Sequence, residues 1–267
     1  MTDRSVEAIR AYWDAHTLGK QYVMDRKITP GTLEYFEHIR PWMNPWKFPD
    51  VMPRIERQAR QLQGKHLLEI GCGMGFDSIE FLKRGVRVTS IDLTPNAVGF
   101  TKRHMELRGL KAEDVRVGNA LALEFPDASF DAVYSIGVLH ATGDLQRAID
   151  EVYRVLKPGG RAIVSHIYRK GSFFRFLGRL GRENLEFKDL DPPVNDFFND
   201  REVRHIFRRF RNVELQIDHF RALPVARRGM KGWLYSNVFQ PVYNTLPEAI
   251  AKRFAHKISV VADKPGE

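Results

Sequence analysis

The sequence predicts an α/β protein with a seven-stranded, mostly parallel sheet, an antiparallel last strand and helices on both faces. From His66 onward, short apolar segments alternate with amphipathic segments of helical spacing, which is the pattern of parallel strands joined by crossover helices. A glycine-rich segment, Gly71–Gly75, follows the first predicted strand. Because open sheets of this kind bind ligands at the carboxyl ends of their strands, we expect a ligand site there.

Capping residues and apolar spacing define the individual elements. Residues 144–156 have apolar side chains at helical intervals and begin with Asp144, a favourable N-cap. Asn199 and Glu202 form a capping box at the start of a later helix. Further helices are expected over residues 4–15, 77–84 and 95–108. The expected strands are residues 66–70, 86–91, 115–117, 130–136, 161–167, 213–217 and 256–262, the last one antiparallel at the end of the sheet.

Three stretches fall outside this alternation. Residues 1–63 are rich in aromatic residues and prolines and are expected to form a helical lid or substrate segment. Residues 64–267 then form the ligand-binding domain, interrupted by insertions at 169–198 and 221–250. Because specificity on such folds resides in loops beside the sheet, we expect the insertions to form a cap over the site.

Composition narrows the class of protein. With 43% hydrophobic and 28% charged residues, the chain has the balance of a folded domain and not that of a disordered one. Its single cysteine, Cys72, excludes an internal disulfide, and no Cys/His cluster has the spacing of a metal site. The N-terminus lacks an apolar signal segment, and no apolar run approaches the ~20 residues of a membrane-spanning helix. We therefore expect a cytoplasmic protein without a bound metal.

The glycine segment indicates the kind of ligand. Its spacing is G-x-G-x-G, and Phe76 stands where a dinucleotide fingerprint has its third glycine. A pyrophosphate fits less well there, because the start of the helix is more crowded. Asp92 lies 21 residues after Gly71, at the end of the next predicted strand, where a carboxylate can accept hydrogen bonds from both hydroxyls of a ribose. The pattern indicates a ribose-containing ligand other than a dinucleotide.

These motifs resemble those of the class I S-adenosylmethionine-dependent methyltransferases, in particular the group that includes the ubiquinone and menaquinone methyltransferases. The resemblance covers roughly residues 64–168 and implies a Rossmann-like fold with S-adenosylmethionine as the cofactor. It does not identify the acceptor of the methyl group. Besides the glycine segment, it rests on Gly118–Ala120, Phe125–Asp131, Ser135–His140 and Glu151–Gly160.

The resemblance also implies roles for individual residues. Glu69 would organise the site beneath the glycine loop, Asp92 would hold the ribose, and Ile136 would lie over the sulfonium. Asn119 stands where the family usually has aspartate, and its side-chain carbonyl can still accept a hydrogen bond from the adenine amino group. Cys72 is expected to pack in the loop and not to act as a nucleophile. The expected cofactor-binding residues are Glu69, Gly71, Cys72, Gly73, Gly75, Asp92, Leu93, Asn119, Ala120, Ile136 and Tyr22.

Methyl transfer from a sulfonium is an in-line displacement, so the enzyme mainly positions the acceptor and excludes water. His140 is the candidate general base, because it follows the fourth predicted strand and imidazole titrates near neutrality. Its alternative role is to shape the pocket. Tyr12 and Trp13, together with Tyr22, are expected in an N-terminal lid. The expected acceptor-binding residues are Tyr12, Trp13, His140, Arg175 and Arg228.

The net charge of +9 lies mostly in residues 169–267, where basic residues interleave with aromatic ones. Three partners fit such a pattern: a small acceptor with an anionic group, a membrane surface that supplies a lipid-like acceptor, or RNA. A solvated basic face without a partner is the fourth explanation. We favour the small or lipid-like acceptor, since no RNA-binding module is visible. An RNA or peptide methyltransferase and a non-catalytic cofactor-binding partner protein remain the alternatives.

Overall fold

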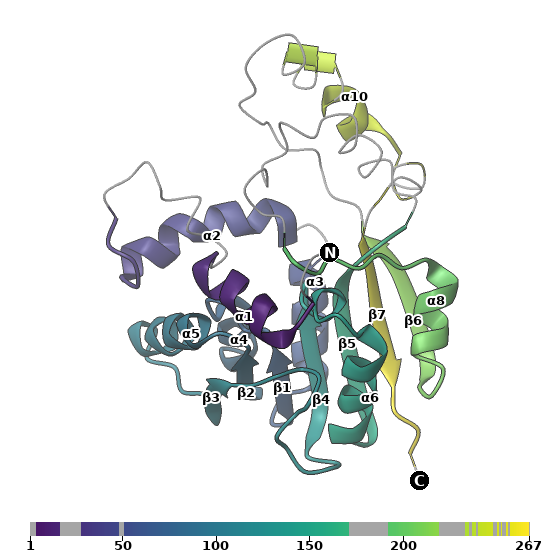
Figure 1. The fold of residues 1–267 in the computed structure, drawn as a ribbon. Coiled ribbons are helices and arrows are strands. Elements are labelled where there is room, and N and C mark those ends of the chain that lie inside the picture. Colours follow the sequence, from purple (N-terminus) through teal and green to yellow (C-terminus); the bar gives the residue numbers. More distant parts are fainter. Residues whose placement is uncertain are drawn as a thin grey trace.

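A seven-stranded sheet forms the centre of the molecule, with the strand order β3-β2-β1-β4-β5-β7-β6 (Figure 1). The computed structural model describes residues 4–16, 28–47, 51–170, 192–218, 233–234, 237–238, 240–247, 250, 252, 255 and 257–266. The strands are β1 His66–Ile70, β2 Arg87–Asp92, β3 Asp114–Val117, β4 Phe130–Ile136, β5 Leu156–Tyr168, β6 Arg211–Asp218 and β7 Lys257–Asp263.

The antiparallel strand predicted from the sequence is confirmed, but its position differs. Strands β1 to β5 pair in parallel, whereas β7 pairs antiparallel with both β5 and β6. The last strand therefore lies one place in from the edge and not at the end of the sheet. Apolar alternation predicts that a strand exists; it does not say which neighbours the strand will take.

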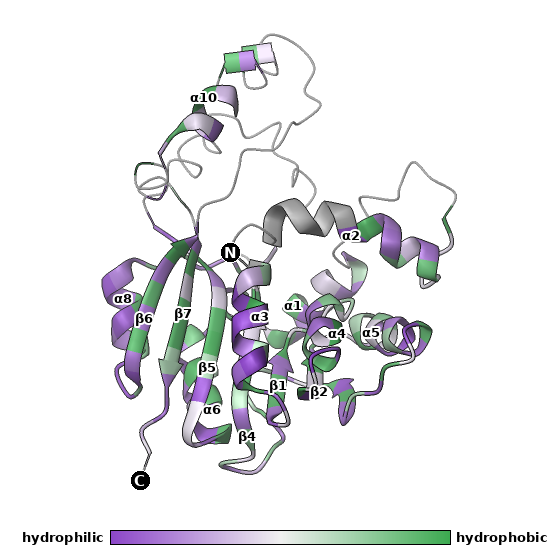
Figure 2. Ribbon diagram, turned by 180° about the vertical axis from the view of Figure 1, so that it is seen from behind, coloured by the Kyte–Doolittle hydropathy of each residue, from purple (hydrophilic) through white to green (hydrophobic). Residues whose placement is uncertain are grey.

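Helices cover both faces of the sheet, as Figures 1 and 2 show from opposite sides. Successive strand residues point to opposite faces, so Leu67 packs against α3 and α4 while Leu68 packs against α6 and α8. Both side chains are fully buried. The helices are α1 Val6–Ala15, α2 Leu33–Lys47, α3 Val51–Gln61, α4 Phe76–Leu82, α5 Pro95–Leu107, α6 Leu145–Val155, α8 Asp200–Ile206 and α10 Gln240–Thr245.

The predicted helix starts occur with the expected hydrogen bonds. The Asp144 side chain accepts from the Arg147 N–H at 2.9 Å and caps α6. Asn199 and Glu202 form both bonds of the capping box at the start of α8. These contacts satisfy N–H groups that have no partner inside their helices.

The N-terminal segment contributes α3 to the hydrophobic core and α1 to the ligand site. Helix α3 packs Ile55 and Ala59 into the same cluster as the strands, so it belongs to the sheet's own core. Its Arg54 forms an ion pair with Asp218 at 2.7 Å, and the two side chains are 4% and 0% exposed. Arg54 also donates to the Ser165 hydroxyl at 3.0 Å. This pair connects α3 to the ends of β5 and β6.

Of the two predicted insertions, the described parts are residues 169–170, residues 192–198 and several short stretches after residue 232. Residues 192–198 return to the sheet, where the Phe198 N–H donates to the Tyr168 carbonyl at 2.8 Å. Figure 1 shows α10 beyond the carboxyl ends of β5 and β6. The described part of the second insertion thus lies at the same edge of the sheet as the glycine segment.

Candidate active site

A pocket of about 200 Å³ lies at the carboxyl ends of β1, β2 and β4. It is lined by the loops that follow β1, β3 and β4, by the end of β2, and by one face of α1. Nine of the residues predicted to bind the cofactor meet there, although they come from four separate parts of the chain. They are Glu69, Gly71, Cys72, Gly73, Asp92, Leu93, Asn119, Ala120 and Ile136.

The glycine loop owes its shape to residues without side chains. Gly71 has φ +81°, a conformation that L-residues rarely adopt. A Cβ atom on Gly71 would lie 2.2 Å from Cγ2 of Val138 in the loop after β4. Gly75, by contrast, does not line the pocket. It is the N-cap of α4, with φ +75°, and a Cβ there would meet Thr101 at 3.0 Å, so its function is in the turn and the packing.

Asp92 at the end of β2 is held in place by donors from two loops. Its Oδ2 accepts from the Gly73 N–H at 3.0 Å, and its Oδ1 accepts from the N–H and hydroxyl of Thr94, both at 3.0 Å. Burial raises the pKa of Asp92, while the N–H groups of Thr94 and Gly73 oppose that shift. A carboxylate offers about four acceptor positions, so Oδ2 retains capacity for a ligand hydroxyl.

Buried polar groups support the loop from below. Glu69 is 2% exposed and accepts hydrogen bonds from the hydroxyls of Ser78 on α4 and Ser90 on β2. The Cys72 sulfur accepts from the Thr101 hydroxyl at 3.4 Å. Burial, together with the nearby carboxylates, raises the pKa of the Cys72 thiol well above its usual value. The thiol therefore stays protonated near neutral pH, which suits packing and not nucleophilic attack.

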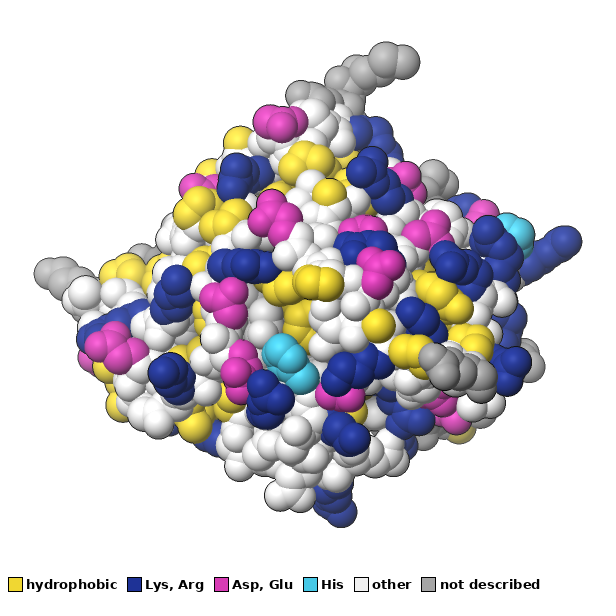
Figure 3. Space-filling model, turned by 90° about the horizontal axis from the view of Figure 1, so that it is seen from below, with side chains coloured by type: hydrophobic (Ala, Val, Ile, Leu, Met, Phe, Trp, Pro, Cys, Tyr) yellow, Lys and Arg dark blue, Asp and Glu magenta, His cyan; other side chains and the backbone are white. Residues whose placement is uncertain are grey.

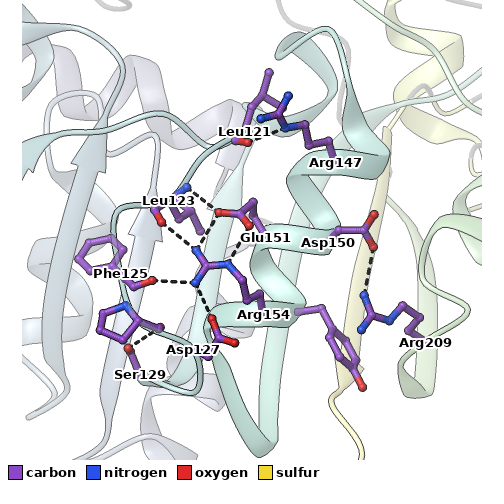
Figure 4. A network of polar contacts seen from close by, with 12 residues as sticks. Leu121, Leu123, Phe125, Asp127, Ser129, Arg147, Asp150, Glu151, Arg154 and Arg209 are labelled. Carbon is purple, nitrogen blue, oxygen red and sulfur yellow. Dashed lines mark hydrogen bonds and ion pairs between the residues drawn. The ribbon is translucent and has the colours of Figure 1, made fainter.

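A row of side chains on α6 holds the loop that carries Asn119 and Ala120 (Figure 4). Arg147 donates to the Leu121 carbonyl at 2.8 Å. About two turns further along the helix, Arg154 donates to the carbonyls of Leu123 and Phe125, both at 2.8 Å. The other partners of Arg154 are Glu151 and Asp127. Arg147 therefore holds the pocket residue Leu121, and Arg154 of the 151–160 motif holds the chain that follows it.

Asn119 has a local role as well as a place in the pocket. Its Oδ1 accepts from the Leu121 N–H at 2.9 Å, so the side chain closes a tight turn. An amide oxygen has two lone pairs, and one of them remains for a ligand donor. Substitution of aspartate by asparagine is thus compatible with both the turn and a hydrogen bond to an adenine amino group.

His104 on α5 supports the glycine loop through the Met74 carbonyl, which accepts from its Nδ1–H at 2.9 Å. Its ring stacks on Phe36 of α2 with centroids 4.0 Å apart. Burial lowers the pKa of His104 to about 4, so the neutral ring is favoured in the folded state. The unfolded chain binds this proton near pH 6.5. Stability should therefore fall as the pH drops from 6.5 towards 4.

Replacing His104 with phenylalanine should remove that contribution. Between pH 7 and pH 5, we expect the wild-type free energy of unfolding to fall by about 2 kcal/mol more than that of His104→Phe. Urea unfolding at the two pH values measures the difference. A substitution of the exposed His205 should leave the wild-type pH dependence intact, and equal slopes for all three proteins would contradict the assignment.

Helix α1 forms the wall opposite the sheet. Val6, Ile9 and Trp13 line the pocket, and the Arg10 guanidinium donates to the Leu93 carbonyl at 3.0 Å. Arg4 contacts the Asp196 carboxylate at 2.6 Å and the Gly143 carbonyl at 3.2 Å. Sequence alone places Trp13 in this wall but misses Val6 and Ile9, which look like ordinary apolar positions of an amphipathic helix.

Tyr12 does not line the pocket. It packs against Trp13 and His16, with ring centroids 5.2 and 4.4 Å away. Its neighbour Trp13 takes the place that both were expected to share, because adjacent residues on a helix point in different directions. Tyr22, Arg175 and Arg228 lie outside the described residues.

His140 is not brought into the pocket, which argues against its expected role as general base. The short 3₁₀ turn Leu139–Ala141 directs its ring against Tyr168, with centroids 4.2 Å apart. The side chain is 4% exposed, and burial lowers its pKa to about 3, with a smaller effect of Lys257. A base of that pKa takes up protons poorly near neutrality, so the residue shapes the structure beside the pocket.

Several lining residues were missed by the sequence analysis because their contribution depends on tertiary packing. Val138 belongs to a motif that resembles the family, yet only its contact with Gly71 makes it part of the wall. Met74, Thr94, Leu121 and Thr142 also line the pocket. Among the described residues, no group of three or more histidine, cysteine or acidic side chains could hold a metal ion.

The chemistry of the pocket fits the cofactor expected from the sequence. Gly73 leaves open space, since no atom lies within 4 Å of the position that a Cβ would take. Asp92 offers acceptors for ribose hydroxyls, and Leu93, Asn119 and Ala120 provide apolar surface and one acceptor for an adenine. These residues would therefore hold S-adenosylmethionine with its ribose at β2 and its amino-acid part at the glycine loop.

Comparison with known proteins agrees with this arrangement. Residues 68–164 match the family model described as a methyltransferase domain. The chain is 33% identical over 180 residues to a demethylmenaquinone methyltransferase of Lactococcus lactis, covering 60% of this chain and 71% of that enzyme. It is 27% identical over 168 residues to the O-methyltransferase resE of Aspergillus sclerotiorum, covering 57% of this chain and 61% of the relative, which is less than two thirds of its length.

Solved structures show the same fold. A phosphoethanolamine N-methyltransferase of Haemonchus contortus, in complex with phosphomonomethylethanolamine and S-adenosylhomocysteine, superimposes with a TM-score of 0.60 at 16% identity. The superposition covers 97% of this chain and 61% of that one. Identity at this level bears on the architecture alone.

Proposed function

Because the chain belongs to the class I S-adenosylmethionine-dependent methyltransferases, we propose that it methylates a small acceptor with an apolar body and an anionic group. The cofactor of this family is S-adenosylmethionine, and the fold and enzyme class agree with the Rossmann-like architecture expected from the sequence. The choice of acceptor class is the proposal.

One observation carries the proposal: apolar side chains form much of the lining of the pocket beside the glycine loop. Ile136 is the last residue of β4, Val138 and Ala141 follow that strand, and Trp13 comes from α1. Such a wall favours an apolar acceptor. The basic residues of both insertions, among them Arg175 and Arg228, favour an anionic group on it.

The chain's own residues position and desolvate the reactants. When bound, S-adenosylmethionine supplies an electrophilic methyl group, and Asp92 and the glycine loop would fix its direction. Helix α1 would exclude water from the reacting atoms, which strengthens electrostatic interactions there. Among the described side chains that line the pocket, none is assigned as a general base.

The function is tested by incubating the protein with methyl-labelled S-adenosylmethionine and fractionated cell extract. We expect label in small organic-soluble or anionic metabolites, and at least about tenfold less transfer by Asp92→Ala at limiting cofactor, since that variant loses the buried acceptor for the ribose. Arg87→Ala, which removes only an exposed ion pair with Glu113, is the matched control.

Three outcomes would contradict parts of the proposal. Label found only in RNA or in protein would replace the small acceptor with a macromolecular one. Cofactor binding without transfer to any fraction would indicate a non-catalytic partner protein. Unchanged cofactor affinity in Asp92→Ala would mean that the nucleoside binds elsewhere.

A further inference from the structure

Exposed apolar side chains are concentrated in one part of the molecule. Six large hydrophobic side chains of the described residues are exposed, and five of them lie within residues 233–250. The sixth, Leu33, lies on α2 and is 41% exposed. We call the group of five the apolar surface of the second insertion. It consists of Trp233, Leu234, Val238, Val242 and Ile250, with exposed fractions of 57%, 48%, 47%, 58% and 45%.

About half of each of these side chains is exposed, and none of the five belongs to a hydrophobic cluster of the described residues. The well-packed helices of this protein bury their apolar faces, as α6 does with five buried residues. Scattered single exposed hydrophobic residues are normal on soluble proteins, whereas a concentration in one segment indicates a contact surface. In the hydropathy view, the described parts of this segment, beyond the edge of the sheet, carry green hydrophobic positions among purple hydrophilic ones (Figure 2).

The charge of the same segment identifies a partner. Residues 219–256 contain six basic residues and one acidic residue. The first insertion has the same character, because residues 169–182 combine basic and large apolar residues and contain no acidic one. The opposite end of the molecule differs: Figure 3 shows acidic and basic side chains interspersed over the face seen from below. In the sequence, the basic excess therefore falls in the same segment as the exposed apolar residues.

Two other occupants fit these observations less well. A second copy would bring two segments of the same positive sign together, and like charges at an interface oppose association. RNA would satisfy the basic residues, but valine, leucine and isoleucine offer nothing to a phosphate backbone or to a base edge. An anionic lipid bilayer provides both parts at once, a negatively charged surface and an apolar layer beneath it.

We propose that the apolar surface of the second insertion docks on an anionic lipid bilayer, with the aromatic and aliphatic side chains at the level of the headgroups. Helix α10 is six residues long, so it rests on the surface of the bilayer and does not cross it. Among the described residues, no helix is long and apolar enough to span a membrane.

Docking in this orientation would place the active-site edge of the sheet towards the bilayer. Both α10 and the glycine loop lie at the carboxyl ends of the strands (Figure 1). A lipid-like acceptor could then reach the pocket without crossing bulk water. The docking itself does not depend on the proposed methyl transfer, because the surface lies outside the residues that line the pocket.

The test is sedimentation of the full chain with vesicles of phosphatidylcholine alone or mixed with phosphatidylglycerol. We expect binding to the mixed vesicles that weakens with added salt, and little binding to phosphatidylcholine. The double variant Leu234→Ser/Val242→Ser should partition about tenfold less, since two aliphatic side chains no longer leave water. Leu33→Ser is the control, because Leu33 is a 41% exposed leucine outside the surface, and this variant should bind like the wild type.

Circular dichroism and cofactor binding of both variants confirm that each is folded. Absence of vesicle binding, or equal loss in Leu33→Ser, would overturn the proposal. So would a dimer in sedimentation velocity that dissociates in the double variant without any vesicle binding, because a second copy would then be the occupant. Methyl transfer to a water-soluble acceptor is measured separately, so that failure of docking and failure of the proposed activity give different results.

Discussion

Replacing Arg54 with methionine should lower the free energy of unfolding by about 3–5 kcal/mol, because Asp218 would remain as an unpaired charge in the core. The Asp218 side chain is fully buried and its two oxygens accept from Arg54 and from the Ser259 hydroxyl. A loss of this size is a large share of the stability of a typical domain. Urea unfolding followed by circular dichroism measures it, and thermal unfolding should show a midpoint lower by roughly 10 °C.

Two further variants test whether the loss of stability in Arg54→Met comes from the unpaired charge of Asp218 or from the loss of packing by the Arg54 side chain. Arg54→Met/Asp218→Leu removes both charges and should recover most of the stability, since a buried pair is often replaced by apolar groups at little cost. Arg87→Met breaks the exposed pair with Glu113 and should leave the free energy of unfolding close to that of the wild type, because exposed ion pairs contribute little to stability. If the double variant were as unstable as Arg54→Met, packing of the long side chain would be the dominant effect instead.

Gly71→Ala should reduce methyl transfer by about 100-fold or more, because the new methyl group collides with Val138 and displaces two walls of the pocket together. The positive φ adds about 1–2 kcal/mol of backbone strain. Cofactor affinity measured by isothermal titration calorimetry should fall in parallel, since the loop that binds the amino-acid part would move.

Gly64→Ala is the control for backbone strain alone. Gly64 has φ +74°, but no atom lies within 4 Å of the position of its Cβ, and it does not line the pocket. This variant should lose stability without losing cofactor affinity. Adding Val138→Ala to Gly71→Ala should restore part of the affinity by removing the two closest methyl groups. If Gly71→Ala bound the cofactor like the wild type, the close approach of the two loops would not control the site.

Features of the fold that depend on residues close together in the sequence could be predicted, whereas features that depend on contacts between distant residues could not. Strand β1 over His66–Ile70 and helix α5 from Pro95 onward follow from spacing, caps and proline placement within a few residues of the chain. The same holds for Asp92, because the end of a strand can be located from local pattern and strand ends meet at one edge of the sheet. Local chemistry therefore predicts most of the cofactor pocket.

Contacts between distant residues account for what the sequence did not predict. The contact of Gly71 with Val138 and the ion pair of Arg54 with Asp218 join residues that no periodicity relates. The orientation of the His140 side chain is a further feature that the sequence does not predict. Its position at the mouth of the sheet is predictable, but the direction of its ring depends on a 3₁₀ turn and on Tyr168. The pKa of His140, and therefore its ability to act as a base, depends on the burial of its ring in the folded protein.

The interior position of β7 also affects the order in which the protein can be assembled on the ribosome. Strand β6 is synthesised before the second insertion, and its only partner in the described sheet, β7, comes after it. Until β7 emerges, β6 has both edges unpaired and β5 has one. Unpaired edges are the places where nascent chains aggregate. Synthesis of residues 219–256 is therefore an interval of vulnerability, in which a chaperone that shields strand edges would raise the yield of folded protein.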